Sequence, residues 1–130
     1  MAIFALAPMP EIRGLIPFYK LIINGHCPYD EFCEQIRMDG NLARILGPMI
    51  NLMDQVANLR RLPHEKFRDI TPKGERHREY EIKRNELRIY MMKFHGHVIV
   101  MAGKKGNQKA DIQRFRQIKR EFLSTKQHSI

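Results

Sequence analysis

The segment from Tyr80 to Lys105 constrains the fold of this chain more than any other part of the sequence. Apolar and polar residues alternate in YEIKR and in ELRIYMMK, and VIVMAG is apolar throughout. A period of two is typical of strands with one buried face, whereas a continuous apolar run suits a central strand. The short stretches NE and HGH separate the three runs and favour turns. The segment therefore predicts an antiparallel β-meander of three strands.

The same alternation assigns several polar side chains of the meander to one face. Lys83, Arg88 and Tyr90 are expected on the side opposite to the apolar residues of their strands. We predict that this face is open. The ordinary explanation for basic residues there is a solvated sheet surface, because Lys and Arg are mostly exposed in proteins.

A strand and two helices are expected before the meander. IPFYKLIING, from Ile16 to Gly25, has the composition of a strand that ends in an Asn-Gly turn. PYDEFCEQIRM begins with Pro28 and places carboxylates in its first turn, which favours a helix N-terminus. A second helix is predicted from Asn41, a suitable N-cap, to Leu59, because apolar residues recur there every three or four positions. Its Gly-Pro step should kink or split it.

The predicted elements add up to an α+β fold in a small single domain. The two N-terminal helices are expected on one face of a twisted antiparallel β-meander, and residues 107–123 predict a C-terminal helix. Residues 60–79 are expected to form a connection with one short strand. Residues 1–15 are predicted to be an N-terminal arm or edge strand, residues 16–126 the main domain and residues 127–130 a polar tail. The 130 residues, of which 43% are hydrophobic, suffice for one core.

Composition disfavours two classes of protein. No apolar run approaches the ~18 residues that a membrane helix needs. The N-terminal MAIFALAPMP is short, has no basic start and contains prolines, unlike a signal peptide. The cysteines Cys27 and Cys33 fit neither zinc-knuckle nor redox-pair spacing, and we expect buried, reduced thiols.

Positive charge is concentrated in the second part of the chain. Residues 1–59 contain four Lys/Arg and six Asp/Glu, a net charge of −2, whereas residues 60–130 contain nineteen and eight, a net charge of +11. A basic region of this kind favours a polyanion or an acidic protein as partner. Charge alone does not decide between them, and a basic surface can also serve only solubility.

The order of elements and several short motifs resemble the RelE/ParE superfamily of bacterial toxins, and within it the HigB-like branch. PYDEF is similar to the start of the family's first helix, and YEIKR to its strand of the type y-E-l-R. ELRIYMMK resembles the strand y-R-v-f-y, and HVIVMAGKKGNQKADIQRF resembles the last strand and the entry to the last helix, i-v-l-l-h-g-f-x-K-K. The resemblance covers roughly residues 16–126.

The resemblance implies the toxin of a type II toxin–antitoxin system. Such a protein is a ribosome-dependent mRNA endoribonuclease that inhibits translation in the cytoplasm, without metal or cofactor. Its partners would be the ribosome, mRNA and a neutralising antitoxin, expected to be acidic, with which it can form a heterotetramer; no membrane is implied. The site residues carried over are catalytic Lys83, Arg88 and His128, and RNA-binding Tyr90, Lys104, Lys105, Lys109 and Arg114.

The chemistry of RNA cleavage gives these residues distinct roles. The 2′-hydroxyl attacks the adjacent phosphorus, so a proton must leave it and negative charge must be stabilised. Arg88 can grip two phosphate oxygens, and Lys83 can stabilise charge or act as a base. His128 is a candidate acid or base. Tyr90 can stack on a nucleobase, and the lysines at 104–105 can hold the backbone.

Other functions stay open from the sequence. A ParE-like toxin that acts on DNA gyrase would have the same fold, although the basic sheet face argues mildly against it. A catalytically inactive, RNA-binding member is the other alternative, because the family's h-g-f step reads MAGK in this chain. The basic strand residues can also be a solvated face, and the tail residue His128 can be without function.

Overall fold

The computed structural model describes residues 2–127, with side chains up to residue 125. It is a small α+β domain, which confirms the predicted fold class. The elements are β1 (Phe4–Pro8), β2 (Phe18–Ile23), α1 (Pro28–Arg37), α2 (Gly40–Ala57), β3 (Phe67–Asp69), β4 (Glu79–Arg84), β5 (Leu87–Lys93), β6 (His97–Lys104), a 3-10 turn (Lys105–Asn107) and α3 (Gln108–Gln127).

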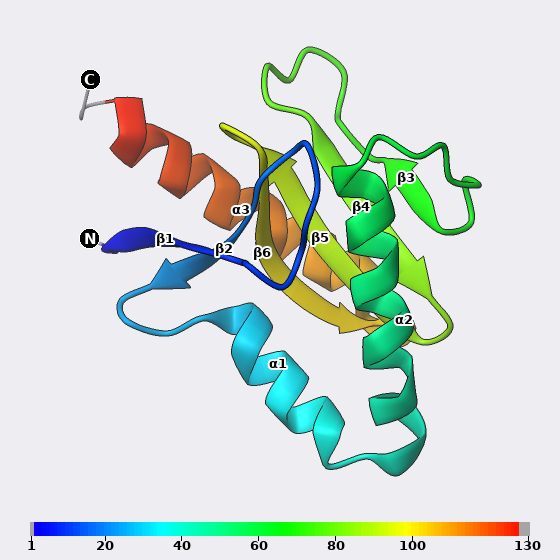
Figure 1. Cartoon of the computed structure of the whole chain (residues 1–130). Coiled ribbons are helices and arrows are strands. Elements are labelled where there is room, and N and C mark those ends of the chain that lie inside the picture. Colours follow the sequence, from blue (N-terminus) through cyan, green and yellow to red (C-terminus); the bar gives the residue numbers. More distant parts are fainter. Residues whose placement is uncertain (1, 128–130) are drawn as a thin grey trace.

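The strands form one mixed sheet in the order β1-β2-β6-β5-β4-β3 (Figure 1). Strands β3 to β6 are antiparallel neighbours, so the predicted meander is confirmed and gains β3 at its edge. β2 joins β6 in parallel, and β1 pairs antiparallel with β2. The first residues of the chain therefore include an edge strand, and Met9 and Ile12 beyond it are buried in the core.

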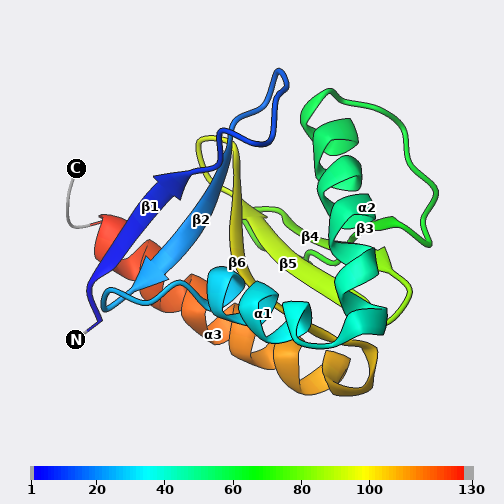
Figure 2. The ribbon, with the colours of Figure 1, turned by 60° about the horizontal axis from the view of Figure 1, so that its bottom comes forward.

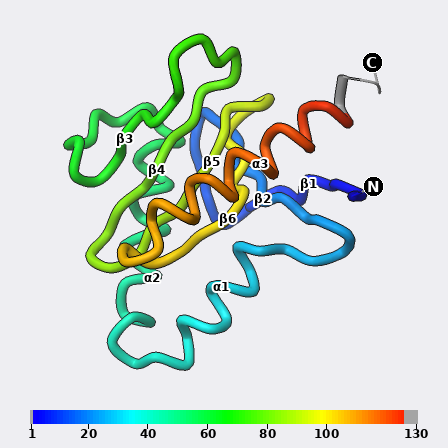
Figure 3. The backbone as a smooth tube through the Cα atoms, turned by 180° about the vertical axis from the view of Figure 1, so that it is seen from behind, coloured from blue at the N-terminus to red at the C-terminus, as the bar shows by residue number. Residues whose placement is uncertain are grey.

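Helices cover both faces of the sheet. α1 and α2 lie on one face, and α3 crosses the other, as Figure 2 shows from the end and Figure 3 from behind. The two N-terminal helices share one face, as predicted. The expectation that the opposite face is open is wrong, because the apolar side of α3 is packed on it through Phe115, Ile118 and Phe122.

The start and the course of α2 differ from the prediction. Its N-cap is Asp39, whose carboxylate accepts hydrogen bonds from the backbone N–H groups of Asn41 (3.0 Å) and Leu42 (3.2 Å). Asp39 therefore satisfies the amides that the prediction assigned to an Asn41 cap. The helix continues through Pro48 without a break. Pro48 removes one N–H, but the residue four positions earlier, Arg44, is exposed, so its carbonyl can turn to water.

A β-bulge in β6 changes which of its side chains point toward α3. Tyr90 pairs with Met101 and Met91 pairs with Ile99, so Val100 is an extra residue on β6. Val100 and Met101 consequently both join the apolar cluster under α3. In the described part of the chain, no helix is long and apolar enough to cross a bilayer.

Candidate functional site

Lys83 and Arg88 lie directly opposite each other on β4 and β5. Side chains of such a pair leave the sheet on the same side. The next pairs along this side are Glu81 with Tyr90, and Gly103 on β6 opposite Arg88. The prediction that Lys83 and Arg88 share one face agrees with this register. The face is the one that α3 covers.

The guanidinium of Arg88 is enclosed in its own hairpin. The residue is 7% exposed, and its Nη1 donates hydrogen bonds of 2.8 Å to the carbonyl oxygens of Asn85 and of Leu87. Its Nε has no hydrogen-bond partner within residues 2–125. The expected exposure of Arg88 is therefore wrong for this conformation, because the β4–β5 turn folds its carbonyls toward the side chain and α3 passes nearby. Lys83, by contrast, is half-buried.

Tyr90 is fully buried, so the expectation that it stacks on a base at an open face is wrong. Its ring stacks on Phe115 of α3, with centroids 6.0 Å apart and an interplanar angle of 28°. Burial is the main cause that raises the pKa of its hydroxyl, and the neighbouring carboxylates of Glu81 and Asp111 add to it. The hydroxyl lies beside Glu81 but makes no hydrogen bond of normal geometry to any described residue.

Buried carboxylates on β4 join the sheet to α3. Glu79, 1% exposed, pairs with Lys119 (Nζ to Oε2, 2.9 Å) and with Arg116 (Nε to Oε1, 2.9 Å). Lys119 is also 1% exposed, and its Nζ donates to the carbonyl oxygen of His77 at 2.6 Å. Charges at this depth are retained only when they are paired. The interface between α3 and the sheet therefore contains buried ion pairs.

Glu81 carries a second part of this network nearer to Arg88. Its Oε1 lies 3.0 Å from Nη2 of Arg68 on β3, and its Oε2 accepts a 2.5 Å hydrogen bond from Gln108, the first residue of α3. The Oε1 contact is an ion pair that lacks hydrogen-bond geometry. Glu81 thus fixes the beginning of α3 to the sheet and still has acceptor capacity.

Four buried polar atoms without a hydrogen bond to the described residues lie where α3 begins, and one of them, Glu81 Oε1, is held only by its ion pair with Arg68. They are Glu81 Oε1, Tyr90 Oη, Arg88 Nε and Arg68 Nε, each buried and without a hydrogen bond to any residue that the structure describes. Buried polar atoms are rarely left unpaired, because each costs about 1–3 kcal/mol. A group of them beside cationic side chains marks a candidate functional site.

Asp111 adds a carboxylate above this cluster. It lies over Gly103, where an added Cβ would meet the carboxylate of Asp111, so a larger residue at this position of β6 would displace that carboxylate. Burial raises the pKa of Asp111, and Arg114 one turn later opposes that shift. A carboxyl group with a raised pKa is suited to exchange a proton nearer to neutral pH.

The remaining predicted site residues are distributed around this end of the sheet. Lys104 and Lys105 are exposed, and the N–H of Lys105 donates to the carbonyl oxygen of Glu86 at 2.8 Å. Lys104 pairs with Leu87, so it faces the α1–α2 side and not the side of Arg88. Lys109 and Arg114 are exposed on α3. His128 lies outside the described residues.

The sequence prediction missed three residues of the site, the acidic Glu81 and Asp111 and the amide Gln108. The alternation in YEIKR puts Glu81 on the same face as Lys83, so that signal was available for Glu81. Asp111 and Gln108 had no such signal, because their approach depends on how α3 docks. Among the described residues, no three His, Cys, Asp or Glu side chains gather into a group that could hold a metal ion.

Comparison of the chain with models of protein families, with curated proteins and with solved structures gives no match.

Proposed function

We propose that this protein is the toxin of a type II toxin–antitoxin system that cleaves mRNA on the ribosome and so inhibits translation in the cytoplasm. Two observations support cleavage of RNA. A cluster of buried polar atoms without hydrogen bonds to the described residues lies around Arg88 and Tyr90, and it sits beside Lys83 and near the exposed Lys105, whose N–H bonds to Glu86 of the β4–β5 turn. The ribosome, the acidic antitoxin and the independence of metal and cofactor are proposed on the resemblance to HigB-like toxins.

The observation that carries the proposal is the pairing of Lys83 with Arg88 next to unpaired acceptors and donors. A phosphodiester at this place would meet two cationic side chains from neighbouring strands. Fixed cations stabilise the negative charge that develops on phosphorus when the 2′-oxygen attacks and the bond to the 5′-oxygen breaks. The exposed Lys105, next to the β4–β5 turn, would hold the flanking backbone.

The substrate has to replace contacts that the protein makes with itself. Arg88 donates to two neutral carbonyls of the β4–β5 hairpin, whose turn residues Asn85 and Glu86 are exposed. A phosphate carries a negative charge and can accept two parallel hydrogen bonds from a guanidinium, which the neutral carbonyls cannot match, so a phosphate can compete for Arg88. We propose that RNA enters at this turn and draws Arg88 out of the hairpin.

Asp111 is our candidate for the group that takes the proton from the 2′-hydroxyl. Its position above Gly103 and the rise of its pKa by burial support this role. We expect Asp111→Asn to slow cleavage by about a hundredfold and to remove the acidic limb of the pH–rate profile. An unchanged pH profile would assign the proton to another residue, with Lys83 and His128 as the remaining candidates.

The test is controlled expression followed by mapping of mRNA 5′ ends, with and without ribosomes. The wild type should arrest growth and cut ribosome-bound mRNA. The double variant Lys83→Ala, Arg88→Ala should cut at least about a hundredfold more slowly. Its matched control, Lys73→Ala with Arg76→Ala, removes two exposed charges from the loop before β4 and should cut normally.

Two outcomes would remove this site. One is equal cutting by the Lys83/Arg88 variant and the wild type. The other is that Arg88→Lys, which keeps the charge but cannot grip two oxygens at once, is as active as the wild type. Thermal unfolding of each variant separates loss of activity from loss of fold.

A second candidate function is RNA binding without cleavage. The burial of Arg88 and its two hydrogen bonds to hairpin carbonyls favour it, since RNA bound at the exposed Lys105, Lys109 and Arg114 would not meet the guanidinium unless it left the hairpin. In this case expression would leave growth unharmed, and purified protein would bind mRNA without producing new 5′ ends. The same mapping experiment therefore decides between the two functions.

A further inference from the structure

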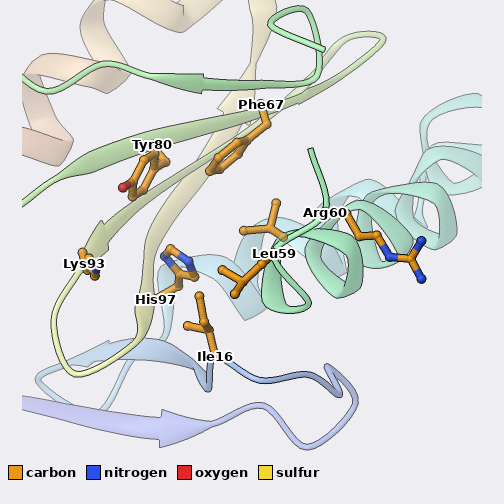
Figure 4. A pocket seen from close by; sticks show the side chains of 8 residues that line it. Ile16, Leu59, Arg60, Phe67, Tyr80, Lys93 and His97 are labelled. Carbon is orange, nitrogen blue, oxygen red and sulfur yellow. The ribbon is translucent and has the colours of Figure 1, made fainter. Parts of the chain in front are cut away.

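A cavity of about 270 Å³ lies at the other end of the sheet, on the face that carries α1 and α2. It opens between the C-terminal end of α2 and strands β3, β4 and β6 (Figure 4). This volume is near the lower limit of small-molecule pockets, which is about 300 Å³. The lining residues are Ile16, Val56, Leu59, Arg60, Phe67, Tyr80, Lys93 and His97.

His97 is the polar group inside this cavity. It is 5% exposed, and Figure 4 shows its ring directed between Tyr80, Leu59 and Ile16. Its Nδ1 has no hydrogen-bond partner among the residues that the structure describes. Burial, with a smaller contribution from Lys93, lowers the pKa of His97 to about 4, so the ring is neutral at physiological pH. A neutral imidazole offers one donor and one acceptor, and here one of them is unused.

Aromatic rings form a wall next to His97. Phe67 and Tyr80 stack with centroids 5.0 Å apart and an interplanar angle of 22°, and the edge of Tyr80 meets His97 at 5.5 Å. Leu59 at the rim is 66% exposed, although it is a large apolar residue. A flat apolar ring would fit such a surface, because stacking on aromatic side chains does not depend on the identity of the ring.

The charge at the rim is positive. Lys93 lies close enough to His97 to lower its pKa, and Arg60 is exposed on the other side, with its guanidinium directed away from the cavity in Figure 4. None of the eight described residues that line the cavity is acidic. An anionic group on a ligand would therefore be attracted to the mouth, with Lys93 as its nearest cation.

We propose that this cavity binds a nucleotide. The base lies against the wall of Phe67 and Tyr80, its polar edge bonds to the imidazole of His97, and the phosphate meets Lys93. An apolar ligand would leave the imidazole of His97 without a polar partner, and a metal ion would meet one imidazole beside the cation Lys93. Two sources have this chemistry, a free mononucleotide and an unpaired nucleotide of RNA. The cavity and the candidate cleavage site lie at opposite ends and on opposite faces of the sheet.

The test is isothermal titration of the purified protein, without ribosomes, using the four ribonucleoside monophosphates and a single-stranded RNA pentamer. We expect saturable binding of at least one mononucleotide. His97→Phe, which fills the space without a ring nitrogen, should weaken it by about tenfold or more. Lys93→Ala changes an exposed residue and should weaken it several-fold without disturbing the fold. The exposed His26 provides the control His26→Phe, which should bind normally.

The arms of the experiment separate the two sources and the two sites. If the RNA pentamer binds more tightly than any mononucleotide and is equally sensitive to Lys93→Ala, the natural ligand is a nucleotide of RNA. If only mononucleotides bind, the natural ligand is a free mononucleotide. The Lys83→Ala, Arg88→Ala variant should bind mononucleotides like the wild type, whether or not the protein cleaves RNA. Equal binding by inorganic phosphate, or no effect of either His97→Phe or Lys93→Ala, would overturn the proposal.

Discussion

The two faces of the sheet use the same strands in opposite ways. On the α1–α2 face the buried side chains are almost all apolar, including Ile82, Ile89, Met53 and Met91. On the α3 face the same strands contribute Glu79, and the buried pairs of that residue hold the helix. The core is therefore apolar on the α1–α2 side of the sheet and partly ionic on the α3 side.

The two faces differ in how they hold their helices: one contributes stability through buried apolar area, and the other selects one docked position of the helix. Apolar contacts hold α1 and α2 in proportion to the buried area and require no particular partner. The ion pairs under α3 work only in one docked position, because a shift would leave charges buried and unpaired. The α3 face also contains the four buried polar atoms without hydrogen bonds to the described residues. These atoms make the α3 face less stable than an apolar core of the same size would be.

The largest effect is expected for Lys119→Met. The change leaves Glu79 buried with Arg116 as its remaining partner, and breaking a buried pair costs about 3–5 kcal/mol. Urea unfolding should report a loss of stability of this size. The double variant Glu79→Leu, Lys119→Met should regain much of it, because both charges are then removed together. A double variant as unstable as the single one would mean that packing, not charge, sets the cost.

Met53→Ala on the opposite face should have a slightly smaller effect. Met53 is fully buried against α1 and the sheet, and truncation of a buried Met costs about 2–5 kcal/mol through lost contacts and the cavity that remains. Here no second substitution of a charged residue should restore stability. Added salt should not change the difference from wild type. Recovery through a partner substitution would contradict the contrast between the two faces.

The pH dependence of stability should reveal the contribution of His97, a buried titratable residue on the α1–α2 face. In the unfolded chain His97 gains a proton near its ordinary pKa of ~6.5, whereas in the folded protein its pKa is about 4. The unfolded state therefore binds more protons between these values, and stability is lost as the pH falls through this window. The loss should reach up to about 3 kcal/mol at pH 4.

The control for this prediction is the variant His97→Phe, which has nothing to titrate at this position. The free energy of unfolding, measured with urea at pH 7, 5.5 and 4, should fall less with decreasing pH in this variant than in the wild type. Other titrating groups, such as Asp111 with its raised pKa, are present in both proteins and cancel in the comparison. An equal fall in both proteins would show that His97 is accessible to protons in the folded state.

The contrast between the faces also explains what the sequence could predict. Alternation in YEIKR and ELRIYMMK predicted the strands and the common side of Lys83 and Arg88, because these are local properties of a pleated chain. The docking of α3 on that side depends on contacts between residues far apart in the chain, such as Lys119 with Glu79, and no local pattern encodes it. A basic strand residue was therefore taken as exposed when it was covered.

The smallest predicted effect is also the one that separates a structural from a functional reading of the α3 face. Tyr90→Phe removes a buried hydroxyl that has no hydrogen bond to the described residues, and relief of such a group should stabilise the protein by about 1 kcal/mol. Tyr29→Phe on the other face removes a hydroxyl that lies beside the thiol of Cys33 and is not one of the unpaired buried atoms, so a small destabilisation is expected there. Thermal unfolding of the two variants should thus shift in opposite directions. If the Tyr90 variant is more stable and cuts RNA less well, the unpaired hydroxyl serves the reaction at the expense of the fold. If it is less stable than the wild type, the hydroxyl is bonded after all, and the cluster around Arg88 belongs to the core.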